Sequence, residues 1–145
     1  MQFKQLGKWL AIGLLILPSV LLLGQTEVPE AVQATFDNLF PNVEYVEWDD
    51  DGEEFFAYFM YEERETEATI LGEGTWVQTM VHLQLEDLPS AAQEYLEEHF
   101  PNYTYFDSLV KVATPSHIRY RVSLESDEES IYLTFSESGE LLPNG

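Results

Sequence analysis

Two stretches of this chain, 60 residues apart, align with each other. Residues 28–42 align with residues 88–102 without a gap, and six of the fifteen positions are identical. These identities are Pro29/Pro89, Ala31/Ala91, Gln33/Gln93, Phe40/Phe100, Pro41/Pro101 and Asn42/Asn102, and the register continues through Tyr45/Tyr105 to Gly74/Gly139 with small insertions. A repeated unit is one supersecondary motif that buries its apolar face together with its copy. We therefore predict a tandem duplication, with repeat one at residues 28–85 and repeat two at residues 88–142.

Each repeat opens with a predicted helix. Apolar residues recur at steps of three and four and form one stripe in each copy: Val28, Val32, Phe36, Leu39 and Phe40, then Leu88, Ala92, Leu96 and Phe100. Such a stripe indicates an amphipathic helix with one buried face. Pro41 and Pro101 end the two helices, because a proline disfavours the helical conformation in the residue before it. His99, at the stripe position of Leu39, is interpreted as a partly buried core or edge residue rather than a ligand.

Short segments rich in β-branched and aromatic residues follow each helix, separated by polar turns. They lie at residues 43–48, 55–62, 66–71 and 75–85 in the first repeat, and at 104–112, 117–125, 130–135 and 140–142 in the second. Segments of this kind predict antiparallel strands. The predicted fold class is therefore α+β. In each repeat a helix is followed by an antiparallel β-meander, and the two helices pack on one face of a curved antiparallel sheet.

Alternation along the strands separates a core face of the sheet from a second, mixed face. The apolar residues that alternation assigns to the core include Val77, Val81 and Leu83, then Phe106, Val110 and Val112, then Ile118, Tyr120, Val122 and Leu124. The second face carries side chains of the kinds enriched in protein-binding hot spots. Its candidate partner-binding residues are Tyr45, Tyr58, Met60, Trp76, Met80, Tyr105, Arg119 and Arg121. Equally, these aromatics could merely shield the sheet or cover one another.

Residues 1–24 are predicted to be a cleaved signal peptide outside the fold. Lys4 and Lys8 precede an apolar run from Trp9 to Leu23, which is the charge-then-apolar arrangement of a secretory signal. The run is shorter than the ~20 residues that span a bilayer, and Pro18 interrupts it. We expect a periplasmic or secreted chain of residues 25–145 in a bacterium, with no stable membrane anchor after cleavage.

The net charge restricts the partners of the chain. Beyond residue 24 there are 27 acidic and 4 basic residues, a net charge of −23. Such a surface repels phosphate backbones, so nucleic-acid binding is excluded. Weak cation binding by the whole acidic surface is expected. The acidic turn at Asp49–Gly52 resembles the start of a calcium loop, but Tyr58 stands where that loop needs a bidentate carboxylate, so we interpret the segment as a hairpin turn.

No pattern of catalytic residues is present in the sequence. The chain has no cysteine, and its three histidines, His82, His99 and His117, lie on three separate predicted elements. No metalloprotease, nucleophile-elbow, phosphate-loop or dinucleotide motif occurs. We expect a protein that is not an enzyme and that holds no cofactor and no dedicated metal ion.

The combination of motifs resembles a known bacterial family. The chain is similar to the PepSY-like, beta-lactamase-inhibitor-like exported proteins in five motifs. These are a Val-Pro helix ending in Phe-Pro-Asn, Glu47-Trp48, Gly74-x-Trp76, a second Leu-Pro helix and the closing sequence Gly139-Glu-Leu-Leu. The resemblance covers residues 28–142 and implies one PepSY-like domain at residues 25–145. It also implies a fold of two helix-plus-sheet repeats and an association with peptidases or other extracytoplasmic enzymes. It carries no set of functional residues.

These observations favour an exported, non-enzymatic protein-binding module, with inhibition or modulation of an extracytoplasmic enzyme such as a peptidase as one form of that activity. The alternative is an acidic structural or cation-buffering protein of the cell envelope. A single saturable protein partner would favour the first interpretation. Weak, salt-sensitive calcium binding at high stoichiometry would favour the second.

Overall fold

The computed structural model describes residues 26–143, although not the side chains of residues 104–107. The predicted signal peptide at residues 1–24 lies outside this range. The helices are α1 (Glu30–Leu39) and α2 (Ser90–His99), and a short 3-10 turn, η1 (Leu85–Asp87), precedes α2. The strands are β1 (Val46–Asp50), β2 (Glu54–Tyr61), β3 (Arg64–Leu71), β4 (Trp76–His82), β5 (Thr104–Ala113), β6 (Ile118–Glu125) and β7 (Ser130–Ser136). The strand predicted at residues 140–142 is reduced to a single bridge between Phe135 and Leu141.

Both helices end as the prolines predict. Each starts directly after its proline, and each ends where the phenylalanine of Phe-Pro-Asn donates its backbone N–H to a carbonyl one turn back. These bonds run from Phe40 to Phe36 and from Phe100 to Leu96, both at 2.9 Å. His99 is exposed at the end of α2, where its ring Nδ1 lies 2.9 Å from the Tyr95 carbonyl oxygen. His99 is therefore an edge residue of α2, without the partial burial that was predicted for it.

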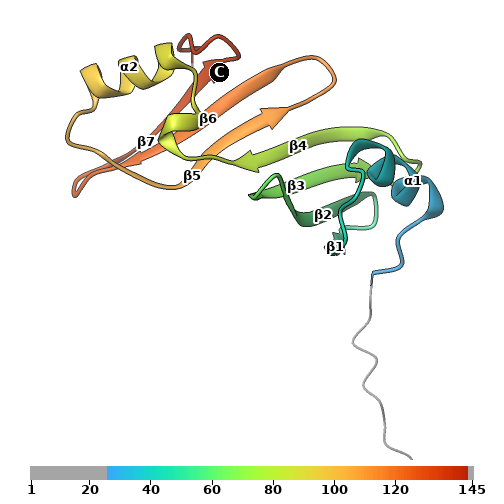
Figure 1. Ribbon diagram of the computed structural model, residues 1–145. Coiled ribbons are helices and arrows are strands. Elements are labelled where there is room, and N and C mark those ends of the chain that lie inside the picture. The colour runs from blue at the N-terminus through green and yellow to red at the C-terminus, as the bar shows by residue number, and fades with distance from the viewer. Residues whose placement is uncertain (1–25, 144–145) are drawn as a thin grey trace, which may run out of the picture.

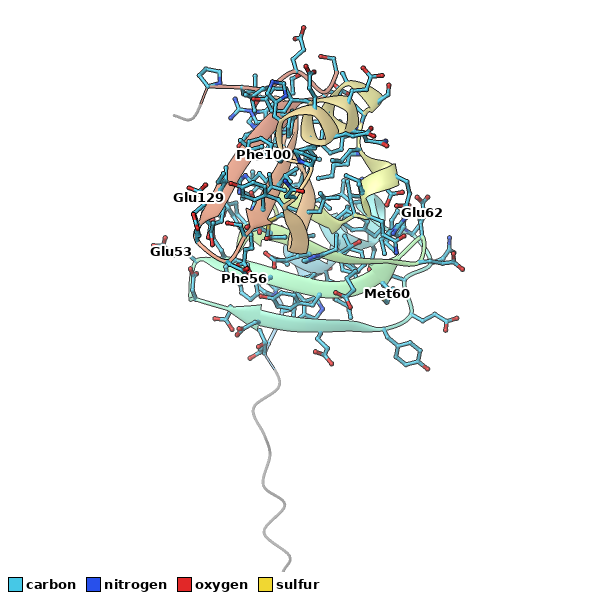
Figure 2. All side chains as sticks on the ribbon, turned by 90° about the vertical axis from the view of Figure 1, so that its left-hand side faces the viewer. Glu53, Phe56, Met60, Glu62, Phe100 and Glu129 are labelled. Carbon is cyan, nitrogen blue, oxygen red and sulfur yellow. The ribbon has the colours of Figure 1, made fainter. Side chains whose placement is uncertain are left out.

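The seven strands form one antiparallel sheet in the order of the sequence, β1 to β7, and the sheet is not closed. α1 and α2 lie at opposite ends of the molecule, with β4 running between them (Figure 1). Figure 2 shows the strands of the second half crossing those of the first half steeply. A sheet of this width accumulates such a twist because each strand is rotated relative to its neighbour.

One row of cross-strand partners shows that both helices cover the same face. The row runs Phe59–Thr66–Val81–Lys111–Tyr120–Phe135 from β2 to β7. Cross-strand partners point to the same side of a sheet. Phe59 packs against Phe36 of α1, with ring centroids 4.9 Å apart, and Phe135 packs against Tyr95 of α2 at 5.7 Å. The α+β class is confirmed, with both helices on one face, here called the helix side. The tandem duplication stays a prediction.

A separate apolar core lies beneath each helix. The first joins α1 to β1–β3 through the buried residues Val32, Phe36, Phe40, Phe55, Ala57, Phe59, Ala68 and Ile70. The second joins α2 to β5–β7 through Leu88, Ala92, Leu96, Leu109, Val122, Leu124, Leu133 and Phe135. The predicted helix stripes thus supply the buried positions Val32 and Phe36 in α1, and Ala92 and Leu96 in α2.

The structure corrects the predicted position of Trp76. Alternation assigned it to the mixed face, but a β-bulge shifts the register between Thr69 and Ile70, so that Thr69 pairs with Gln78 and Ile70 with Trp76. An extra residue in one strand reverses the direction of the side chains beyond it. Trp76 is therefore half-buried on the helix side, packed against the first core, and its Nε1–H donates to Thr79 Oγ1 at 3.0 Å.

Two glycines place the turns after β3 and β7 against the starts of the helices. Gly74 and Gly139 have φ angles of +93° and +87°. A Cβ atom on Gly74 would lie 2.8 Å from the Ala31 carbonyl oxygen, and one on Gly139 would lie 2.8 Å from Pro89 Cβ. These turns can therefore approach the helices only because both residues lack a side chain.

Substitution of Phe36 tests the first core. Phe36 is 2% exposed, and its ring meets those of Phe40, Trp48 and Phe59. We expect Phe36→Ala to lower the free energy of unfolding by about 3–5 kcal/mol, measured by urea denaturation. Tyr132→Ala, at a tyrosine that is 69% exposed, is the control and should change the free energy by less than about 0.5 kcal/mol. A loss below about 1 kcal/mol for Phe36→Ala would contradict the packing described here.

Substitution of Gly139 tests the contact between turn and helix. Gly52 also has a positive φ, +96°, but nothing lies within 4 Å of a Cβ built on it. Gly52→Ala should therefore cost only the conformational strain, about 1–2 kcal/mol. Gly139→Ala should cost about 1–3 kcal/mol more, because its methyl group overlaps Pro89 and the Ala92 amide. Equal losses of stability in the two variants would show that the close approach is absent.

Candidate functional site

No helix among the described residues packs on the face of the sheet opposite the helix side, here called the open face. One row of cross-strand partners crosses it from β1 to β7 and consists of Glu47, Tyr58, Glu67, Met80, Val112, Arg119 and Ser136. Because these residues are paired in register, their side chains share this face. The open face is the candidate functional site.

Most of the predicted partner-binding residues gather on this face. Tyr58 and Met60, from β2, are 43% and 57% exposed; Figure 2 labels Met60 near one end of β2 and Phe56 near the other. Met80 from β4 is half-buried, and Arg119 and Arg121 from β6 are exposed. The other three differ: Tyr45 precedes β1 and is 85% exposed, Trp76 lies on the helix side, and Tyr105 belongs to β5 with a side chain outside the described residues.

A groove of about 530 Å³ occupies the β1–β4 part of the open face. It is lined by Tyr45, Glu47, Tyr58, Phe59, Met60, Glu65, Thr66, Glu67 and His82. The predicted site contained neither His82 nor the glutamates of this groove. His82 has the same strand parity as Met80. Glu65 is the cross-strand partner of Met60, and Glu67 is that of Tyr58. Strand parity could have identified them. Because the chain has so many acidic residues, nothing in the sequence distinguished one carboxylate from another as a site residue.

The open face is electrostatically divided. The β1–β3 part carries Glu47, Glu65 and Glu67, whereas β6 carries Arg119 and Arg121, with Glu125 at its end. The only ion pair among the described residues joins Arg64 and Asp87, 2.6 Å apart. Arg64 lies on the helix side, because its cross-strand partner Tyr61 has the same strand parity as Phe59. Arg119 and Arg121 are therefore free, within the described part of the chain, to receive an anionic group.

Burial changes the ionisation of two groups in the groove. Desolvation raises the pKa of the Glu67 carboxyl, and the nearby His82 opposes this rise. Desolvation also raises the pKa of the Tyr58 hydroxyl, and the charges of Glu67 and Asp49 add to that rise. The floor of the groove thus disfavours negative charge, although carboxylates surround it.

The side chains of β5 correct a second prediction. Alternation assigned Val110 and Val112 to the core face, but Val112 pairs with Met80 and Arg119 on the open face, where it is 2% exposed. Leu109 instead belongs to the core beneath α2. The register shift in β5, from Tyr105–Leu124 to Leu109–Val122, adds an even number of residues and leaves the alternation intact. The prediction was wrong because it assigned the wrong one of the two alternating sets of β5 to the core.

The acidic segment Asp49–Gly52 forms the end of β1 and the start of the hairpin turn to β2, so a hairpin turn lies here as predicted. Asp51 Oδ1 accepts backbone N–H groups from Glu53 at 3.1 Å and Glu54 at 2.9 Å, and these bonds lower the pKa of its carboxyl. The described residues contain no group of three or more His, Asp or Glu side chains placed to hold a metal ion. In the same range, no helix has the length and apolar character to cross a membrane.

Substitution of Glu67 tests the desolvation of the groove. A carboxyl whose pKa is raised on folding binds its proton more tightly in the folded state, so its contribution to stability is lost as the pH rises through the raised pKa. Glu67→Gln should therefore raise the melting temperature at pH 7, and the gain should disappear below about pH 4.3, where an unburied glutamate protonates. Glu65→Gln, at an exposed residue of the same strand face, controls for the loss of one negative charge. An equal gain in both variants would contradict the role of burial.

Solved structures of bacterial proteins share this fold. A BLIP-like protein from Bacteroides fragilis is 26% identical, with a TM-score of 0.74 over 83% of this chain and 86% of that chain. A DUF2874 family protein from Bacteroides ovatus is 22% identical, with a TM-score of 0.72 over 81% and 86% of the two chains. A protein from Bacteroides eggerthii described as "putative periplasmic" is 17% identical, with a TM-score of 0.72 over 81% and 87%. No curated protein matches the chain.

The sequence itself matches a family model. The model, described as "Putative beta-lactamase-inhibitor-like, PepSY-like", matches residues 53–143, from the turn before β2 to the end of the described chain. This range contains β2–β7 and α2, but not α1 or β1. Since the match covers more than half of the 145 residues, the chain belongs to the PepSY-like, beta-lactamase-inhibitor-like family.

Proposed function

We propose that this chain is an exported protein-binding module, and that its open face docks against a folded extracytoplasmic protein. The observation that carries this proposal is the uncovered row from Glu47 to Arg119. In this row an exposed tyrosine lies between two carboxylates, and a half-buried methionine lies between the second carboxylate and the arginine side of the face. Tyrosine, methionine and arginine are the residue types enriched at the centres of protein interfaces.

The exposure of large side chains supports docking by this face. Tyr45, Tyr58, Met60 and Tyr132 account for four of the six exposed large hydrophobic residues in the described chain. Three of them lie on the open face, and Tyr45 borders its groove. Burying such a side chain contributes roughly 1.5–3 kcal/mol relative to leaving it in water, so a partner would gain substantially by covering this face.

The charge pattern adds specificity to this surface. A partner that fits it presents a basic patch toward Glu47, Glu65 and Glu67, and a carboxylate toward Arg119 and Arg121. Complementary charges of this kind accelerate association and exclude partners with the wrong pattern. The net charge of −23 beyond residue 24 further selects against acidic partners that lack a basic patch.

An extracytoplasmic enzyme is the class of partner that we propose, with a peptidase as one example and inhibition as the consequence of docking. The family description and the BLIP-like neighbour support an inhibitory role. The charge-then-apolar segment at residues 1–24 and the "putative periplasmic" neighbour support export. The cation-buffering alternative rests on net charge alone, because the described residues contain no metal-holding cluster.

Affinity capture from the extracytoplasmic fraction tests the proposal. We expect a single saturable partner whose binding is weakened at least tenfold by Tyr58→Ala and by Arg121→Glu, because both substitutions remove central contacts. Leu141→Ala, at a residue that is 40% exposed outside the open face, is the control and should bind as the unaltered chain does. Melting temperatures within a few degrees would show that the variants are folded.

Two results would contradict the proposal. The first is an equal loss of partner binding in Tyr58→Ala and Leu141→Ala, which would place the contact outside the open face. The second is calcium binding at high stoichiometry without any saturable protein partner. When a captured enzyme has a measurable activity, that activity should fall as the chain is added in excess, and this result separates inhibition from simple binding. Trp76→Ala does not test the open face, since it removes a half-buried ring from the helix side.

A further inference from the structure

The two helices leave the middle of the sheet uncovered on the helix side. α1 packs over β1–β3 and α2 over β5–β7, so neither core reaches β4 beyond its first residue, Trp76. A groove of about 440 Å³ lies there, over β3, β4 and β5 and beside the end of α1. This volume falls within the range of about 300–1,000 Å³ that is typical of small-molecule sites.

The groove is lined mainly by apolar side chains, and Glu62, Thr66 and Thr79 are its uncharged or acidic polar residues. Leu39 at the end of α1, Val81 of β4 and Leu83, which follows β4, supply aliphatic surface. The β-bulge directs Trp76 into the same groove, where the hydrogen bond from its Nε1–H to Thr79 Oγ1 at 3.0 Å fixes the indole ring. Bulges are common beside functional sites, where they redirect a side chain.

A single unpaired cation lies among these apolar residues. Lys111 lines the groove and is half-buried, with Val81 and Tyr120 as its neighbours in the cross-strand row. No carboxylate of the described residues lies within 4.0 Å of its ammonium group, although the chain carries 27 acidic residues. The other cation of the groove, Arg64, is neutralised by Asp87 at 2.6 Å. One positive charge therefore lacks a counterion in a partly desolvated site.

We propose that this groove binds a small amphipathic monoanion, a carboxylate with an apolar tail. The ammonium group of Lys111 binds the carboxylate, and the tail packs against Trp76, Val81 and Leu83. A charge-assisted hydrogen bond in an apolar groove is stronger than one in water. The groove lies on the opposite face of the sheet from the proposed docking surface, so the failure of either proposal leaves the other standing.

Titration with octanoate tests this site, followed by isothermal calorimetry and by tryptophan fluorescence in 0.15 M salt. At this ionic strength screening over about 8 Å reduces the repulsion from distant carboxylates. We expect saturable 1:1 binding with a change in emission from Trp76. Neutral 1-octanol should bind about tenfold more weakly, because it cannot form the charged contact.

Substitutions of Lys111 separate the site from general attraction to a cation. Lys111→Met should weaken octanoate binding about tenfold and leave the binding of 1-octanol unchanged, whereas Lys111→Arg should retain octanoate binding. Arg119→Met removes the same charge from the open face and should have no effect. If Lys111→Met does not fold, as judged by thermal unfolding, Lys111→Gln replaces it.

Four results would overturn the proposal: octanoate binding that does not saturate, binding without a change in tryptophan emission, equal losses of affinity in Lys111→Met and Arg119→Met, or equal affinities for octanoate and 1-octanol. The first two would place binding outside the groove. The last two would show that Lys111 does not bind the carboxylate.

Discussion

The ladder between β4 and β5 is the connection on which the rest of the structure depends. Its four residue pairs, from Thr79–Ala113 to His82–Val110, join the two halves, whose apolar cores share no residue. A ten-residue helix is about 15 Å long, whereas seven strands at a spacing of about 4.8 Å span roughly 30 Å. Neither helix can therefore cover both halves. The groove over β4 and the uncovered open face both follow from joining two small cores into one wide sheet.

Much of this arrangement could be predicted from the sequence, up to the points where strand register breaks. The helix boundaries, the α+β class and the positions of Tyr58, Met60 and Arg121 follow from periodicity in segments that pair without interruption. Trp76 was assigned to the wrong face because alternation predicts the direction of a side chain only while each residue opposes one residue of the neighbouring strand. The β-bulge depends on how β3 and β4 pair, and neither strand carries a local sequence signal for it. Val112 was assigned to the wrong face because β5 carries apolar residues at both parities, so its pattern does not show which set faces the helices.

The wrong choice of core face in β5 also misplaced the most informative charge. Alternation placed Lys111 with Leu109 on the mixed face, but both lie on the helix side. Among four basic residues beyond the predicted leader, Arg64 is paired with Asp87, Arg119 and Arg121 lie on the open face, and Lys111 lies in the groove. Because positive charge is so scarce in this chain, its placement is more informative than that of any carboxylate.

The edges of the sheet favour docking by a face over docking by strand addition. β1 has five residues, three of them acidic, and short charged edge strands resist pairing with another chain. At the other edge, the backbone N–H of Leu142 donates to the Thr134 carbonyl at 2.8 Å and that of Ser136 donates to the Glu140 carbonyl at 2.8 Å, so the last residues occupy part of β7. A partner that cannot extend the sheet must bind through side chains. Among the described residues, the large exposed side chains with both charges beside them lie on the open face.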